Sequence, residues 1–245
     1  NEKDGPGGVG PQGFIQPTIT FPYTVRFENL EDATAPAQIV TIKDQLDTSL
    51  NAATFVFTEF GFGDLRISLT PEDNPRDFYR AVPYSYGDVE FIVEIVGTVS
   101  ETGLVEVGFY SADEDGMPLP VEIGFLPPED GTGLGQGFFS YMVDPLKDLP
   151  TGTEIRNVAA ITFDYQSTIT TNQKDPHDPS QGTDPTLECL LTVDVAKPTC
   201  TVNPLPEILK QTEVELSWTG SDIGSGIASY DVYVATNNLS RAFWK

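Results

Sequence analysis

The sequence predicts an all-β protein, a sandwich or barrel of short antiparallel strands. In the segment 23–28 apolar and polar residues alternate, so a pleated strand would turn Tyr23, Val25 and Phe27 to one face. Similar short runs recur along the chain, separated by Gly, Pro and Asp turn signals at intervals of about 8 to 12 residues. No segment shows a sustained helical period of apolar residues, so we expect almost no helix.

The expected strands follow one another in order. The segments 23–28 and 38–42, with the polar connection 29–36 between them, predict a hairpin. An acidic loop with two prolines is expected at 71–77. Further strands are expected at 54–60, 65–69, 91–99, 105–109, 121–125, 139–143, 158–163, 189–195, 214–218 and 230–234.

The composition divides the chain into three parts. Residues 1–16, with five glycines and two prolines, are typical of a linker and of the middle of a longer polypeptide, so we expect the chain to be cut from one. Residues 17–196 hold the first β-domain, with two packed β sub-parts as an alternative. Residues 197–245 follow the hinge at Lys197 and Pro198 and hold only half of the strands of a closed sandwich. The missing half would be cleaved, disordered or supplied from elsewhere.

The charge balance excludes several partners. The chain has 13 basic and 37 acidic residues and a formal net charge of −24, which would repel nucleic acid and anionic lipid. No run of apolar residues is long enough to insert into a membrane. Dense carboxylates favour Ca²⁺, whose ligands are oxygen atoms, although they also serve simply to keep a protein soluble.

Two groups of carboxylates are candidate calcium ligands. Asp44 and Asp47 close the second expected strand, and Asp164 ends a later one, so the sheets could bring these three together. Asp113 and Asp115 lie in an acidic segment whose spacing does not match an EF-hand loop. Plain capping of turns is the alternative for both groups.

The two cysteines predict a disulfide between Cys189 and Cys200, which would pin the two β-domains together in an oxidising setting. Because eleven residue steps separate them, the bond requires a sharp turn near Lys197 and Pro198. Two buried thiols, or a partner elsewhere, are the alternatives.

Few residues indicate covalent chemistry. His177 lies in a polar loop without a serine-nucleophile motif, which favours an exposed histidine over a catalytic one. Lys43 is a candidate donor for an isopeptide bond to an asparagine such as Asn157, with a carboxylate as catalyst. A solvated lysine is the usual case.

Several long segments carry a family resemblance. GPQGFIQPTITFPYTVRFEN, ATAPAQIVTIKDQLD, GFLPPEDGTGLGQGFFSYMV and LPTGTEIRNVAAITFD resemble a conserved-repeat, immunoglobulin-like module of very large secreted and cell-surface bacterial proteins. PTCTVNPLP and LSWTGSDIGSGIASYDVYV resemble the first half of a fibronectin type III-like module. The resemblance implies an antiparallel immunoglobulin-like β-sandwich with long loops, followed by a partial fibronectin type III-like β-sandwich. The chain departs from the pattern at Lys43, at Cys200 and in the longer loop around His177.

These features favour a non-enzymatic structural or adhesive module of a large secreted or surface-anchored bacterial protein. It would be a stalk, a filament subunit or an adhesin arm, outside the cell or on its surface, and stiffened by Ca²⁺. Its partners would be neighbouring modules of the same chain, copies of itself, or a surface glycan or protein. The alternative is a glycan- or peptide-binding module appended to an extracellular enzyme, with an exposed aromatic surface drawn from Tyr84, Tyr86, Phe138 and Tyr141.

Overall fold

The computed structural model describes residues 1–206, 208, 213–235 and 240–244, and these residues form an almost entirely β structure. The three helices among them are short 3₁₀ turns, η1 (Pro71–Asp73), η2 (Pro179–Gln181) and η3 (Pro185–Leu187), and none is long and apolar enough to cross a membrane. The prediction of an all-β fold with antiparallel sheets is confirmed. The strands are β1 (Glu2–Asp4), β2 (Phe14–Ile15), β3 (Phe21–Glu28), β4 (Ile39–Gln45), β5 (Leu50–Phe62), β6 (Leu65–Ser68), β7 (Asp77–Tyr86), β8 (Val89–Val99), β9 (Leu104–Ala112), β10 (Gln136–Pro145), β11 (Glu154–Asn157), β12 (Ala159–Phe163), β13 (Ile169–Thr170), β14 (Cys189–Val193), β15 (Thr199–Val202), β16 (Trp218–Ser221), β17 (Tyr233–Val234) and β18 (Ala242–Phe243).

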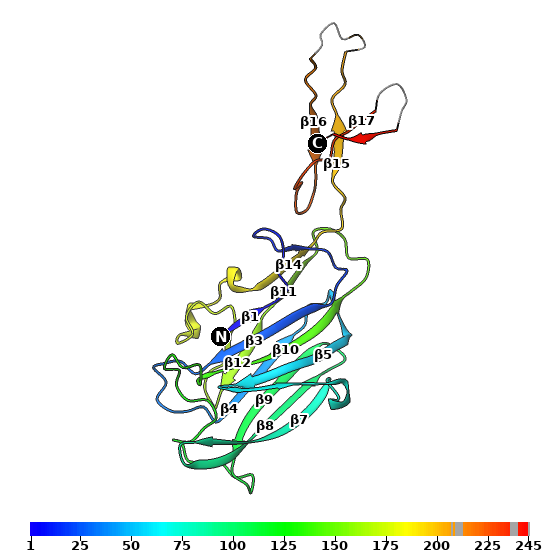
Figure 1. The fold of residues 1–245 in the computed structure, drawn as a ribbon. Coiled ribbons are helices and arrows are strands. Elements are labelled where there is room, and N and C mark those ends of the chain that lie inside the picture. The colour runs from blue at the N-terminus through cyan, green and yellow to red at the C-terminus, as the bar shows by residue number, and fades with distance from the viewer. Residues whose placement is uncertain (207, 209–212, 236–239, 245) are drawn as a thin grey trace.

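Two large sheets form the body of the first module, residues 1–196 (Figure 1). One sheet has the order β1-β3-β10-β5-β6 and the other the order β13-β12-β4-β9-β8-β7. Aromatic rings join them: the centroids of Phe27 and Phe109 lie 5.1 Å apart, as do those of Phe57 and Phe78. Tilted and edge-to-face contacts of this kind bury large apolar areas, so the core lies between the two sheets.

The predicted hairpin between 23–28 and 38–42 is wrong, although both strands exist. β3 pairs with β1 and β10, whereas β4 pairs with β9 and β12 in the opposite sheet. The apolar face of a strand is covered by the facing sheet, whichever strands pair with it and in whichever of the two sheets it lies. The alternation therefore identified the buried face of each strand without fixing its neighbour.

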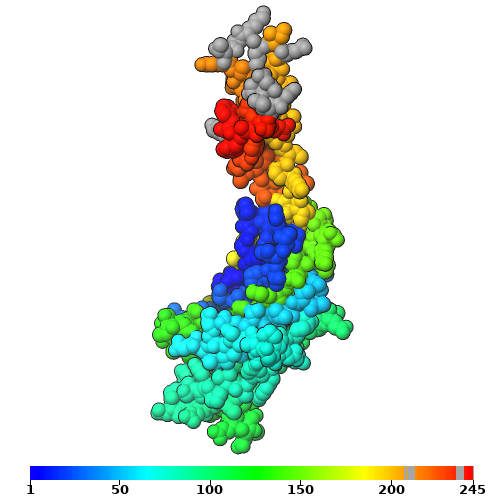
Figure 2. All heavy atoms as spheres, turned by 45° about the vertical axis from the view of Figure 1, so that its right-hand side comes forward, coloured from blue at the N-terminus to red at the C-terminus, as the bar shows by residue number. Residues whose placement is uncertain are grey.

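The N-terminal segment 1–16 contains two strands of the first module, so its prediction as a linker is wrong. β1 pairs antiparallel with β3, and β2 pairs parallel with β14 in a small sheet of order β11-β14-β2. Figure 2 shows this segment, in blue, lying against the body of the molecule. Its glycines allow close contacts: Gly13 has φ +60° and lies so near the carbonyl oxygen of Leu190 that no side chain would fit.

The described part of the second module extends from the end of the first (Figure 1). β15 pairs with β16 and β17 with β18, each antiparallel. The strand expected at 214–218 begins only at Trp218, and the one expected at 121–125 is irregular, although Phe125 is fully buried. Several apolar side chains of this module remain largely exposed, among them Val202, Ile223, Tyr233, Phe243 and Trp244.

Candidate functional site

Four polar side chains meet in the interior of the first module, and we call them the buried cluster. Lys3 of β1 and Asp44 of β4 are fully buried, with the Lys3 amine against Asp44 Oδ2. Tyr141 of β10 donates from its hydroxyl to the same Oδ2 over 2.8 Å. Asn157 of β11 donates from Nδ2 to the Tyr141 hydroxyl over 3.1 Å. A continuous set of polar contacts therefore runs from Lys3 to Asn157.

Strand alternation aims these side chains inward. Along β4, Val40, Ile42 and Asp44 are the buried positions, so Asp44 occupies a place where the pattern calls for an apolar residue. Asn157 is buried at the end of β11, two residues before Ala159, which pairs with Asp44. The cluster lies where β11 ends in the small sheet and β12 begins in the large one.

Burial sets the electrostatics of the cluster. The Lys3 amine lies 5.3 Å from the ring centroid of Tyr23 and 5.3 Å from that of Tyr141. Burial lowers the pKa of Lys3, while Asp44 opposes that effect. Burial also raises the pKa of Tyr141 well above its usual value, and the nearby Asp44 charge adds to the rise. Tyr141 therefore stays a neutral hydrogen-bond donor, and Lys3 loses its proton more readily than an exposed lysine.

Three oxygen atoms around the cluster are buried without a hydrogen-bond partner among the described residues: Asp44 Oδ1, Asn157 Oδ1 and Tyr23 Oη. Buried polar atoms are nearly always paired, because an unpaired one loses its hydration without compensation. Asn157 Oδ1 is an amide oxygen and can only accept a hydrogen bond. Asp44 Oδ1 can likewise only accept as long as the carboxylate is ionised. A proton on Asp44 would supply the missing donor.

The three carboxylates predicted to bind calcium together are separated in the structure. Asp44 is engaged with Lys3, and Asp47 accepts the backbone N–H groups of Ser49 and Arg156. Asp164 follows the opposite end of β12, next to Ile39 and about 16 Å from the Asp44 position at strand spacing. Its Oδ1 accepts two backbone N–H groups at the start of β4. No three His, Cys, Asp or Glu side chains in the described ranges are grouped to hold a metal ion, and calcium binding stays a prediction.

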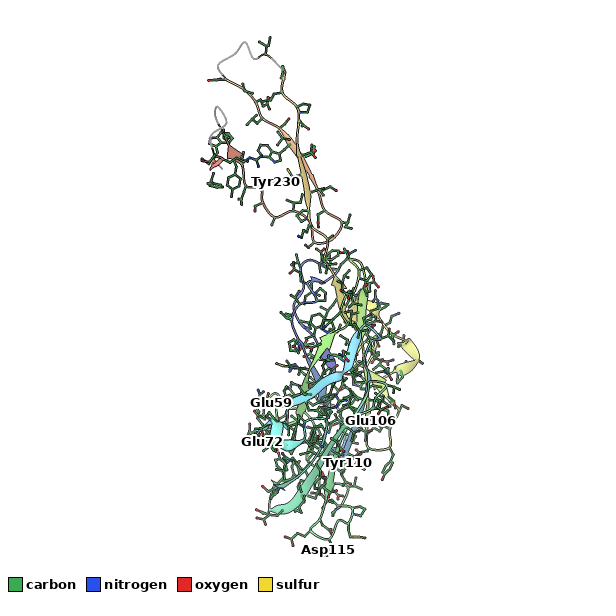
Figure 3. The ribbon with its side chains drawn as sticks, turned by 90° about the vertical axis from the view of Figure 1, so that its right-hand side faces the viewer. Glu59, Glu72, Glu106, Tyr110, Asp115 and Tyr230 are labelled. Atoms are coloured by element: carbon green, nitrogen blue, oxygen red, sulfur yellow. The ribbon has the colours of Figure 1, made fainter. Side chains whose placement is uncertain are left out.

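The acidic segment around residue 113 forms a tight turn. Asp113 Oδ1 accepts the backbone N–H groups of Asp115 (3.0 Å) and Met117 (2.7 Å), and Gly116 has φ +76°. These bonds match the turn-capping alternative. Figure 3 places Asp115 at the end of the molecule opposite Tyr230 of the second module.

The predicted disulfide is not formed, and both cysteines are free thiols. Cys189 starts β14 opposite Asn157, beside the buried cluster, and burial raises its pKa to about 11. Cys200 is exposed on β15 of the second module. The strands that hold them belong to different sheets, so the turn that the bond requires does not bring the sulfur atoms together.

Lys43 is a solvated lysine, the usual case, and not the candidate isopeptide donor. Its side chain lies on the outer face of β4, 66% exposed, with its amine 3.0 Å from Glu106. The next residue, Asp44, faces inward because successive side chains alternate. Of the lysines that the structure describes, the buried one is Lys3, in the segment that composition alone assigns to a linker.

The predicted aromatic binding surface is also not assembled as expected. Tyr141 is fully buried, and Arg66 covers the ring of Phe138 at 4.7 Å. Tyr84 and Tyr86 are half-buried, and Tyr84 packs edge-on against Phe62. These side chains belong to different environments and do not share one exposed surface.

His177 is exposed as predicted, and it pairs with two carboxylates. Its Nε2 lies 3.1 Å from Asp32 and its Nδ1 3.3 Å from Asp175. The hydrogen bond to Asp32 is the main cause of a raised His177 pKa. The group links two surface loops.

Comparison with known proteins gives limited similarity. A family model described as a domain of unknown function, DUF7619, matches residues 122–176. No curated protein matches. Among solved structures, the collagen-binding subdomain of the Enterococcus faecalis surface protein ACE is 11% identical, with 78% of this chain and 93% of that chain covered and a TM-score of 0.34. The collagen-binding domain from a Staphylococcus aureus adhesin is 13% identical, with 79% and 97% covered and a TM-score of 0.35.

Proposed function

We propose that this chain is a non-enzymatic structural or adhesive part of a large secreted or surface-anchored bacterial protein, where it acts as a stalk, filament subunit or adhesin arm. The observation that carries the proposal is the joint between the two modules. Asp194, at the end of the first module, accepts the backbone N–H of Ser225 over 2.8 Å and its hydroxyl over 2.7 Å. The N–H groups of Val195 and Ala196 both bond the hydroxyl of Thr151.

A joint held by side chains of both modules would set the direction of the second one, which extends away from the first in Figure 1. Such a connection suits an extended chain of modules, in which fixed joints keep the two ends of the chain far apart. The high negative charge supports the same role, because like-charged neighbours stay soluble and do not collapse on one another.

Labelling of intact cells tests the proposal. Antibodies raised against residues 1–245 should stain unpermeabilised cells of the source bacterium or detect the parent protein in its medium. Staining that requires permeabilised cells would contradict the proposal. A binding panel of glycans and extracellular matrix proteins, including collagen, then separates an adhesin arm, which binds, from a stalk, which does not.

Calcium stiffening is tested separately by thermal unfolding. A ligand that binds only the folded state raises the melting temperature with its concentration. The chain should therefore melt higher in calcium than in EDTA, and equal melting temperatures would contradict a calcium site.

A further inference from the structure

We propose that Lys3 and Asn157 of the buried cluster join in an intramolecular isopeptide bond, with Asp44 as the catalytic acid and base. The proposal rests on three observations: a fully buried lysine against a fully buried carboxylate, a buried asparagine joined to that carboxylate through Tyr141, and partnerless oxygens on both acceptors. Lys3 supplies a nitrogen nucleophile, Asn157 a carbonyl carbon, and Asp44 a group that can carry a proton between them.

The pair of Lys3 and Asp44 can become neutral without losing a proton to solvent. Transfer of one proton from the Lys3 amine to Asp44 leaves a free amine and a carboxylic acid, and this removes two charges from the protein interior. Burial favours that form, since it lowers the pKa of Lys3. The neutral amine is the form able to attack a carbonyl carbon.

The covalent step balances without any further reactant. The Lys3 Nζ lone pair attacks Cγ of Asn157 while the Asp44 acid donates a hydrogen bond to Asn157 Oδ1, which develops negative charge. Asp44 then moves a proton from the Lys3 nitrogen to Nδ2 and regains its own. The Cγ–Nδ2 bond breaks, ammonia leaves, and an Nζ–Cγ amide remains.

The reaction also explains the partnerless atoms. A protonated Asp44 carries an O–H group that can donate a hydrogen bond. Asn157 Oδ1 is a buried acceptor that lacks a donor. In the product the lysine carries no charge, so neither Lys3 nor Asp44 remains as a buried ion. An ion pair that must otherwise be stabilised in the interior is replaced by an amide and a carboxylic acid.

The bond would tie the first strand of the module to β11. Tension applied at residue 1 would pass from Lys3 directly to Asn157, and residues 4–156 would carry none of it. The neighbouring strand of β11 is β14, which leads to the joint with the second module. The bond would therefore reduce the covalent path between the two ends of the first module to residues 1–3 and 157–196.

Intact mass of the denatured chain tests the proposal. Purified residues 1–245, measured with reductant present, should be lighter than the sequence by one ammonia. Trypsin should then fail to cut after Lys3 and should release the peptide 1–26 joined to the peptide 157–174. The full sequence mass, with normal cleavage after Lys3, would overturn the proposal.

Variants assign the roles. Asp44→Asn removes the proton carrier and should restore the full mass, and Lys3→Arg should do the same. Asn157→Asp keeps the carbonyl carbon but changes the leaving group, so its mass should fall by one water in place of one ammonia. The control Lys43→Arg, at the outward-facing neighbour of Asp44, should lose ammonia as the wild type does. A cross-linked peptide that survives in Asp44→Asn would exclude Asp44 as catalyst, and because masses are read after denaturation, poor folding of one variant does not affect the wild-type result.

Discussion

The two modules have comparable strand-forming sequences and differ in what their strands bury. In the first module, Phe109 is fully buried and packs against the ring of Phe27 in the facing sheet and that of Phe125 in the irregular segment 121–125. In the second, Phe243 is 64% exposed, and its ring lies edge-on to that of Tyr233, itself 54% exposed. Alternating apolar residues therefore produce a stable sandwich only when a facing sheet covers them. The first module has that sheet, and the described part of the second does not.

The largest expected effect comes from matched phenylalanine substitutions in the two modules. Phe109→Ala should lower the free energy of unfolding of the first module by up to about 5 kcal/mol, because it opens a cavity in a closed core. Phe243→Ala lies in the second module. It should change the urea midpoint of the second module by less than the error of the measurement. Equal losses from the two substitutions would break the comparison.

A smaller effect is expected at the buried cluster. Lys3→Met should cost the first module about 3 kcal/mol, because it removes the buried polar group that Asp44 contacts and, with it, the proposed covalent bond. The matched control is Lys43→Met, whose exposed pair with Glu106 should contribute nothing measurable in urea titrations. If both variants unfold at the wild-type midpoint, the cluster does not stabilise the module.

The joint should respond to pH through Asp194. Hydrogen bonds from Ser225 lower the pKa of Asp194 below its ordinary 3.8. A lowered folded pKa means that the joint has its full strength above pH 3.8 and weakens as the pH falls through the lowered value. Hydrogen exchange at the Ser225 amide should accelerate over that range beyond the intrinsic pH dependence, and Asp194→Ala should show fast exchange at every pH. A wild-type amide whose protection does not change across the range would contradict this role.

The smallest effect is expected at the surface of the first module. Because Asp32 raises the pKa of His177, the contact should stabilise the two loops below pH 6.5 and fade as the pH rises through the raised value. An NMR titration should give a His177 pKa above 6.5, and Asp32→Asn should bring it down. An unchanged value in that variant would exclude Asp32 as the cause.

The sequence was sufficient to predict which faces are buried, since alternation at Tyr23, Val25 and Phe27 directly reflects the pleat. It was not sufficient to place β4 in the opposite sheet, because strand pairing is decided by the whole set of strands. β7 was missed for a local reason: Pro83 interrupts the pattern, and it is tolerated because β7 is an edge strand.

The buried cluster left a signal that composition concealed. Asp44 continues the inward series Val40 and Ile42, and Asn157 continues the series that begins at Ile155. A polar residue on an apolar face indicates a buried partner. The partner Lys3 could not be chosen from sequence, since it lies 41 residues from Asp44 in a segment rich in glycine.

The claim that the first module is a covalently closed unit is tested most directly by stretching single molecules from their two ends. Each residue that unfolds under force releases roughly 3.6 Å of chain. We predict that wild-type molecules never release residues 4–156, whereas Asn157→Ala molecules release them fully. Wild-type molecules that extend as far as the variant would contradict the account.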